Sequence, residues 1–147
     1  MGSKTRMNYT VMGNAVNLGA RLEPANKEYG TLILTSELTV AELGNRVAVR
    51  ELDVIRAVGN VKPIRIFEVL DRTDALDAAT LKLLPAFNAA LELYRARRWR
   101  EAADAFAAVR ELRLEDGPSA TYFNRCRGYI AAPPPANWDG VWNQLTK

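Results

Sequence analysis

The chain contains no histidine and a single cysteine among its 147 residues. Cys126 therefore has no partner for an internal disulfide, and the commonest metal ligand and proton shuttle of proteins is missing. No run of about 18 uncharged apolar residues occurs, and residues 1–6 lack the apolar core of a signal peptide. These absences predict a chain of a reducing, cytoplasmic compartment that makes no membrane contact of its own.

The chain also has little excess of one sign of charge over the other. Lys and Arg total 20, Asp and Glu total 17, and the net charge is +3. The densest basic cluster is Arg95, Arg97, Arg98 and Arg100, and no basic stripe with interleaved aromatic residues accompanies it. A nucleic-acid-binding protein is expected to carry such a stripe, so the composition disfavours a nucleic-acid partner. A hydrophobic content of 48% is typical of a globular protein.

Residues 1–70 alternate between short strand and helix patterns. Asn14 can cap a helix over 15–28, which Pro24 is expected to kink or divide, and Gly30 ends that helix. Ser36 can cap a second helix over 37–43, which Gly44 ends. Short strands are expected at 8–12 and 31–35.

A β-hairpin is expected at the end of this half. Residues 47–58 are rich in β-branched side chains, and their inside–outside alternation slips near Glu51, which predicts a bulge. The turn dipeptide Gly59–Asn60 separates this strand from a second one over 64–70. The first half therefore predicts an α+β sandwich, with helices packed on one face of a sheet.

The second half is helical. A polar stretch at 71–78, predicted to be a linker, precedes an expected helical unit over 79–130. Pro85 is expected in the first turn of its first helix, and Pro118 at the start of its third. Three prolines at 133–135 then end helix formation. The remainder of the tail, 131–147, is expected to be extended, with Trp138 and Trp142 docked on the chain's own surface and Cys126 buried as a small core residue.

Asn17 and Arg21 belong to the most informative stretch, YTVMGNAVNLGARLE, at 9–23. Four residues apart on a helix, they share one face. An amide beside a guanidinium suits a ribose or phosphate oxygen whose charge grows during a reaction. From spacing alone, the alternative is that Asn17 and Arg21 cap a turn and make a surface ion pair with Glu23 or Glu28.

This stretch closely resembles the signature YTVxGDxVNxAxRLE of class III nucleotidyl cyclases, which convert ATP or GTP into the cyclic monophosphate. The resemblance continues in order through residues 27–30, 32–37 and 50–53, and it also includes residues 2–6. It covers about half of the chain, 2–70, and favours a catalytic arrangement of Asn17 and Arg21. It implies the C-terminal half of a ferredoxin-like catalytic sandwich.

The resemblance also implies roles for individual residues. Asn17 would orient the ribose, Arg21 would neutralise charge developing on the phosphate, and Thr10 would accept from the exocyclic amine of adenine. This favours an adenylate cyclase that converts ATP into cyclic AMP and pyrophosphate. The two Mg²⁺ or Mn²⁺ ions of the parent enzyme would be held by the half of the domain that this chain lacks, so the chain alone is expected to be inactive. The active site would lie at a homodimer interface.

Two positions depart from the family pattern. Asn14 replaces the usual Asp, which we interpret as a variant of the turn or cap. Val58 replaces a Lys that contacts the triphosphate, and Lys62 lies close enough in the sequence to substitute for it.

Residues 94–142 resemble the C-terminal extension of bacterial cyclases with a CHASE2 sensor, whose parent proteins are anchored in the inner membrane. Trp99, Ala102 and Phe106 are similar to the second half of a tetratricopeptide (TPR) repeat, which suggests a small all-α, TPR-like unit. An alternative function is therefore a non-catalytic interaction or regulatory module. Because half a sandwich leaves apolar surface and sheet edge uncovered, self-association is expected.

Overall fold

The computed structural model describes residues 28–31, 34–56 and 62–143. It divides into two compact units. In the described residues, the sheet unit comprises 34–56, 62–73 and 141–143, and the helical unit comprises 28–31 and 74–140. The short segment 28–31 is thus grouped with residues that follow it by more than 40 positions. The mixture of a sheet and helices is compatible with the predicted α+β class, but a TPR-like unit is not shown.

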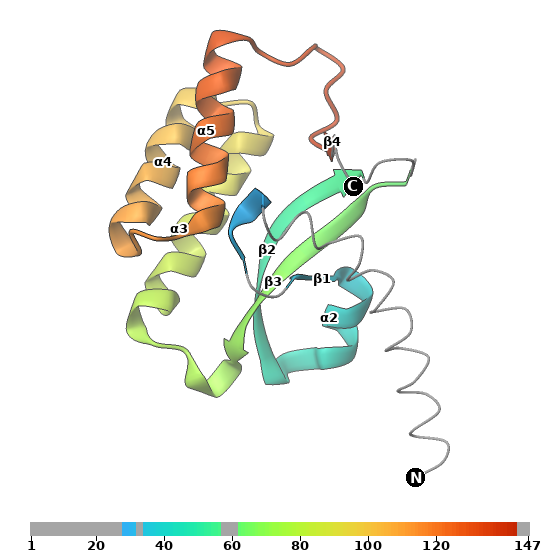
Figure 1. Cartoon of the computed structure of the whole chain (residues 1–147), viewed down its shortest axis with the longest axis vertical. Coiled ribbons are helices and arrows are strands. Elements are labelled where there is room, and N and C mark those ends of the chain that lie inside the picture. The colour runs from blue at the N-terminus through green and yellow to red at the C-terminus, as the bar shows by residue number, and fades with distance from the viewer. Residues whose placement is uncertain (1–27, 32–33, 57–61, 144–147) are drawn as a thin grey trace. The chain divides into compact units, whose positions relative to one another are not determined.

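The sheet unit contains a four-stranded sheet with the order β1-β3-β2-β4 in the described residues. Long strands β2 and β3 form the antiparallel hairpin expected from the sequence, β1 adds to β3 antiparallel, and β4 adds to β2 parallel (Figure 1). The strands are β1 (Leu34–Ser36), β2 (Val47–Arg56), β3 (Ile64–Arg72) and β4 (Trp142–Asn143).

Helix α2 (Glu37–Leu43) has the predicted boundaries. The Ser36 hydroxyl accepts a hydrogen bond from the Thr39 backbone N–H at 3.4 Å, which satisfies one of the unpaired donors of the first turn. Gly44 follows at φ 63°, a conformation that glycine adopts without the Cβ clash of other residues. Local chemistry at both ends therefore fixes this helix.

The predicted bulge in β2 is confirmed. Glu51 pairs with Phe67 and Asp53 with Ile66, so Leu52 is an additional residue on its strand. Leu52 and the adjacent Asp53 are both buried, which accounts for the slip in alternation that the sequence displays.

A buried ion pair joins the hairpin strands beside this bulge. Arg50 is 1% exposed and lies directly opposite Glu68 on β3, where its Nε donates to Glu68 Oε2 at 3.0 Å. A cross-strand pair of opposite charges favours one strand register over its neighbours, because a slip would leave the buried guanidinium without its carboxylate.

The helical unit consists of α3 (Ala78–Arg95), α4 (Trp99–Leu112) and α5 (Gly117–Ala131), which lie side by side in Figure 1. Phe106 of α4 stacks on Tyr122 of α5 at 5.0 Å between ring centroids, and Phe87 of α3 meets both rings edge-on. All three side chains are fully buried. The predicted helical periodicity therefore produces an aromatic core shared by three helices.

The expected position of Pro85 is wrong. Helix α3 begins at Ala78, so Pro85 lies inside the helix rather than in its first turn. Asp77 caps the helix by accepting the Thr80 backbone N–H at 2.8 Å, and this cap sets the start. Proline removes the bond to the carbonyl of Leu81, which lies on an exposed part of the helix where water can bind that oxygen.

The expected linker at 71–78 contains regular structure along most of its length. It includes the last residues of β3, a 3₁₀ turn at Thr73–Ala75 and the first residue of α3.

The tail docks on the chain itself, as expected. Trp138 packs 5.3 Å from Trp99 and 5.6 Å from Tyr94, measured between ring centroids. Arg97, at φ 65°, donates to the carbonyls of Pro134 and Pro135 at 2.8 and 3.1 Å. Trp142 lies in β4 and pairs with Ile55 of the sheet unit.

The Asp77 cap makes helix stability dependent on pH. Hydrogen bonds from the hydroxyl and backbone N–H of Thr80 hold the pKa of Asp77 below its usual 3.8. A lowered carboxyl pKa stabilises the fold above the unfolded pKa, and this contribution is lost as the pH falls through the folded pKa. We expect Asp77→Ala to melt at a lower temperature than the wild type at pH 7, with the difference shrinking below pH 4. Melting curves followed by circular dichroism check this, and a difference that is constant from pH 7 to pH 2.5 contradicts it.

The buried cysteine is expected to be inert. Cys126 is 0% exposed, and burial raises the pKa of its thiol to about 11. At pH 8 only about one thiol in a thousand would then be ionised, and the thiolate is the reactive form. We expect a disulfide reagent such as DTNB to label the folded chain slowly and the urea-unfolded chain at once. Equal rates in both states would contradict a core position.

Candidate functional site

The structure places one of the four site residues predicted from the sequence. Lys62 is exposed and precedes Pro63 at the entry to β3. Thr10, Asn17 and Arg21 lie outside the described residues, as does Val58.

Most of the helix predicted over 15–28 lies outside the described residues, but its last residue and the glycine expected to end it are described. Glu28 and Tyr29 are helical, and Gly30 follows as a turn at φ 67°. Tyr29, beside that glycine, is 0% exposed. Within the helical unit, Arg125 and Gly117 of α5 lie against Tyr29.

Arg125 of α5 is the main polar contact of this helix end. Its Nη2 donates to the Tyr29 hydroxyl at 2.8 Å and to Glu28 Oε1 at 3.2 Å. The guanidinium carbon also lies 5.3 Å from the centre of the Tyr29 ring and 5.0 Å from that of Tyr122, within reach of cation–π attraction. Because Arg125 is only 8% exposed, its charge depends on these partners in place of water.

Two further residues complete the contact, and all three lie four residues apart on α5. Thr121 Oγ1 donates to the Glu28 carbonyl at 2.9 Å. Gly117 lies so close that a Cβ atom there would overlap the Tyr29 carbonyl oxygen and stand 3.1 Å from the Gly30 Cα. Residues at i, i+4 and i+8 share one face of a helix. We refer to Gly117, Thr121 and Arg125 as the anchor stripe.

The start of α5 sets the direction in which the anchor stripe faces. Asp116 is buried and accepts the Ser119 backbone N–H at 3.2 Å, while Pro118 occupies the first turn. Proline is well suited there because its missing N–H has no helical partner in that turn.

Sequence reasoning missed the anchor stripe, since Arg125 and Tyr29 are 96 positions apart. The only available signal was a glycine, a threonine and an arginine at four-residue spacing, a pattern that names no partner.

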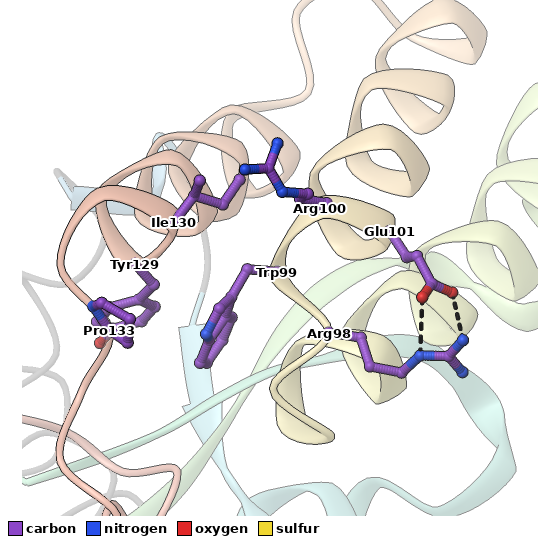
Figure 2. Close-up of a pocket in the computed structure, with 7 residues that line it drawn as sticks. All are labelled: Arg98, Trp99, Arg100, Glu101, Tyr129, Ile130 and Pro133. Atoms are coloured by element: carbon purple, nitrogen blue, oxygen red, sulfur yellow. Dashed lines mark hydrogen bonds and ion pairs between the residues drawn. The ribbon is translucent and has the colours of Figure 1, made fainter.

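A second feature is a surface hollow of about 310 Å³ on the helical unit (Figure 2). Trp99 and Tyr129 provide aromatic walls, 4.7 Å apart between ring centroids. At its rim, Arg98 Nε donates to Glu101 Oε1 at 3.0 Å, and both side chains are more than half exposed. The lining residues are Arg98, Trp99, Arg100, Glu101, Tyr129, Ile130 and Pro133. Such a surface can contact a peptide, but it brings no pair of acid and base groups together for catalysis.

The described residues show neither a metal site nor a membrane-spanning helix. No group of three His, Cys, Asp or Glu side chains among them could hold a metal ion. In the same residues, no helix combines the length and apolar character needed to cross a membrane.

Comparison with known proteins relates the chain to adenylate cyclases. It is 41% identical over 70 residues to adenylate cyclase 1 of Rhizobium meliloti, a match that covers 48% of this chain. It is 30% identical over 130 residues to the terminal-differentiation-specific adenylate cyclase of Dictyostelium discoideum, which covers 86% of this chain. The matches span 10% and 6% of those relatives, respectively. No family model and no solved structure matches the chain.

The extent of the Dictyostelium match bears on the helical unit. A match over 86% of the chain cannot be confined to the first 70 residues. The similarity to an adenylate cyclase therefore continues into the helices that follow the predicted catalytic segment.

Proposed function

We propose that the chain is the C-terminal half of a class III adenylate cyclase catalytic domain, followed by its helical extension. In the parent protein the reaction is the conversion of ATP into 3′,5′-cyclic AMP and pyrophosphate. The observation that carries this proposal is the cyclase-like stretch at 9–23 in a chain related to two proteins named adenylate cyclase. The active site is formed at a homodimer interface, with ATP as its substrate.

The chain contributes positioning and charge. Asn17 orients the ribose so that its 3′ oxygen is aligned with the α-phosphorus, and Arg21 offsets negative charge that develops on the phosphate. Alignment of this kind accounts for much of what a protein supplies to phosphoryl transfer. Thr10 accepts from the adenine amine, and Lys62 attracts the triphosphate in place of the family's lysine, where this chain has Val58.

The parent enzyme is expected to use Mg²⁺ or Mn²⁺. The described residues do not form a site for such an ion. The ligands are assigned to the first half of the catalytic domain, and the isolated chain is therefore expected to be inactive.

The test is a mixing experiment. The chain is combined with a separately expressed N-terminal half from its parent gene, and cyclic AMP formation from Mn²⁺-ATP is measured by chromatography. Product that forms in the mixture and in neither half alone supports the proposal. Two halves that demonstrably bind each other and yield no product contradict it.

A second candidate function is a non-catalytic interaction module in the helical unit. The hollow between α4 and α5 favours it, because half-buried aromatic walls beside exposed arginine side chains suit an acidic peptide. The same mixing experiment separates the two candidates, since binding of the halves without product favours the module.

A further inference from the structure

We propose that the hollow on the helical unit binds a second copy of this chain, through the turn that joins α4 to α5 in that copy. Leu114 of the second copy packs against the aromatic walls of the hollow, and its acidic neighbours face Arg100. This inference rests on the second candidate function and deepens it, because it names the partner that the hollow takes.

An apolar surface at one end of the helical unit gives the first step of the argument. Three of the four large apolar side chains that are exposed in the described residues are Leu81, Leu112 and Leu114, at 58%, 40% and 79% exposure. They are the chain neighbours of a bonded pair, because Arg113 Nη2 donates to Thr80 Oγ1 at 2.6 Å. We refer to these three leucines as the leucine patch. Exposed apolar side chains that gather in this way mark a surface for contact with another protein.

The length of α4 gives the second step. The hollow includes Trp99, the first residue of this helix, and the leucine patch includes Leu112, the last. A helix of 14 residues is about 21 Å long, so the patch cannot enter the hollow of its own copy. A contact between the two surfaces therefore joins two copies of the chain.

Unpaired charges of opposite sign give the third step. Arg100 in the hollow and Glu111 and Glu115 beside the leucine patch are exposed, and none of these side chains has a hydrogen-bond or ion-pair partner in the part of the chain that the structure describes. In Figure 2, dashed lines join Arg98 to Glu101, and none reaches Arg100.

The net charges of the two surfaces are also opposite. The lining of the hollow contains two arginines and one glutamate, whereas residues 111–115 contain two glutamates and one arginine. Opposite charges beside apolar surfaces steer two proteins together and fix the register of their contact.

The contact joins different surfaces of the two copies, so it is heterologous. Such a contact either closes into a ring or continues from copy to copy into larger assemblies. The smallest ring is a dimer in which both hollows are occupied. Association is expected to weaken as salt is added, because the charges that guide it are exposed and therefore screened.

Two charge reversals in the full chain test the contact by sedimentation velocity. Arg100→Glu and Glu111→Arg each place like charges together and are expected to lower the association constant at least about tenfold. Both variants should fold, since an acid near the start of α4 and a base near its end suit the helix dipole. Arg46→Glu makes the same change of charge on an exposed arginine of the sheet unit and should leave association unchanged.

A mixture of the two variants gives the sharpest result. Equal amounts of Arg100→Glu and Glu111→Arg should restore wild-type association, because the acidic hollow of one variant meets the basic turn of the other. Two variants that each associate weakly and do not rescue one another would overturn the proposal. So would a wild-type chain that stays monomeric up to about 1 mM.

Two equally exposed leucines test the apolar part of the contact. Leu114 is 79% exposed in the turn and Leu38 is 78% exposed on α2. Leu114→Ser is expected to lower the association constant about tenfold, since it removes the side chain that enters the hollow, and Leu38→Ser should have no effect. Equal association of these two variants contradicts the assigned contact.

A peptide titration separates this inference from the second candidate function. The Leu114→Ser chain, whose hollow is open, is titrated with a short synthetic peptide of alternating Glu and Leu while tryptophan fluorescence is recorded. Peptide binding that Arg100→Glu abolishes, in a wild-type chain that does not self-associate, leaves the second candidate standing and overturns the inference. Absence of both peptide binding and self-association refutes both, and none of these measurements depends on cyclase activity.

Discussion

Replacing Arg21 by alanine is expected to lower the kcat of the mixed halves about 100- to 1000-fold, as the loss of one preorganised donor to a developing negative charge does in other enzymes. The guanidinium acts on charge that grows in the transition state, so the KM for ATP should change little. Initial rates of cyclic AMP formation over a range of ATP concentrations separate the two constants.

Arg46→Ala is the control for this substitution. Arg46 is an exposed arginine beyond α2 that donates to the Leu43 carbonyl and has no assigned role in the reaction. It removes the same charge from the chain and should leave both constants unchanged. A loss under about threefold for Arg21→Ala, or an equal loss in both variants, would contradict a transition-state role.

Elements governed by neighbouring residues were predicted well from the sequence. The limits of α2 follow from a serine cap and a stopping glycine, and the bulge in β2 follows from a slip of alternation that places Leu52 and Asp53 in the interior together. In both cases the signal and the structure lie within a few residues of each other.

Competition between local signals caused the error at Pro85. Proline is favoured in the first turn of a helix, but Asp77 and Thr80 form a cap eight residues earlier, and an apolar face from Leu83 to Tyr94 stabilises the helix through the proline. The free energy gained by burying this long apolar face outweighs the loss of one backbone hydrogen bond at Pro85.

The anchor stripe was beyond prediction for a different reason. Thr121 and Arg125 are ordinary helix-surface residues until Glu28 and Tyr29 are placed against them, and more than 90 positions separate the partners. Of the site residues predicted from the motif, Lys62 is exposed in the structure, and the roles of Asn17, Arg21 and Thr10 stay predictions.

Truncating the centre of the helical core is expected to have the largest effect on stability. Phe106 is 0% exposed and contacts the rings of Phe87 and Tyr122, so it joins all three helices. Phe106→Ala should lower the free energy of unfolding of the helical unit by about 3–5 kcal/mol, since it removes a large apolar side chain and leaves a cavity. Urea denaturation followed by tryptophan fluorescence measures this, because Trp99 and Trp138 lie in the helical unit.

Phe106→Leu separates the cavity from the change of residue type, because it keeps most of the apolar volume and is expected to cost less than the alanine variant. An alanine variant that loses under about 1 kcal/mol would mean that the three helices do not share this core.

The loss of stability expected for Phe106→Ala also has a consequence for Tyr29. The anchor stripe is presented by α5, whose position depends on the stacking of Tyr122 on Phe106, so a chain that loses this core should also release segment 28–31.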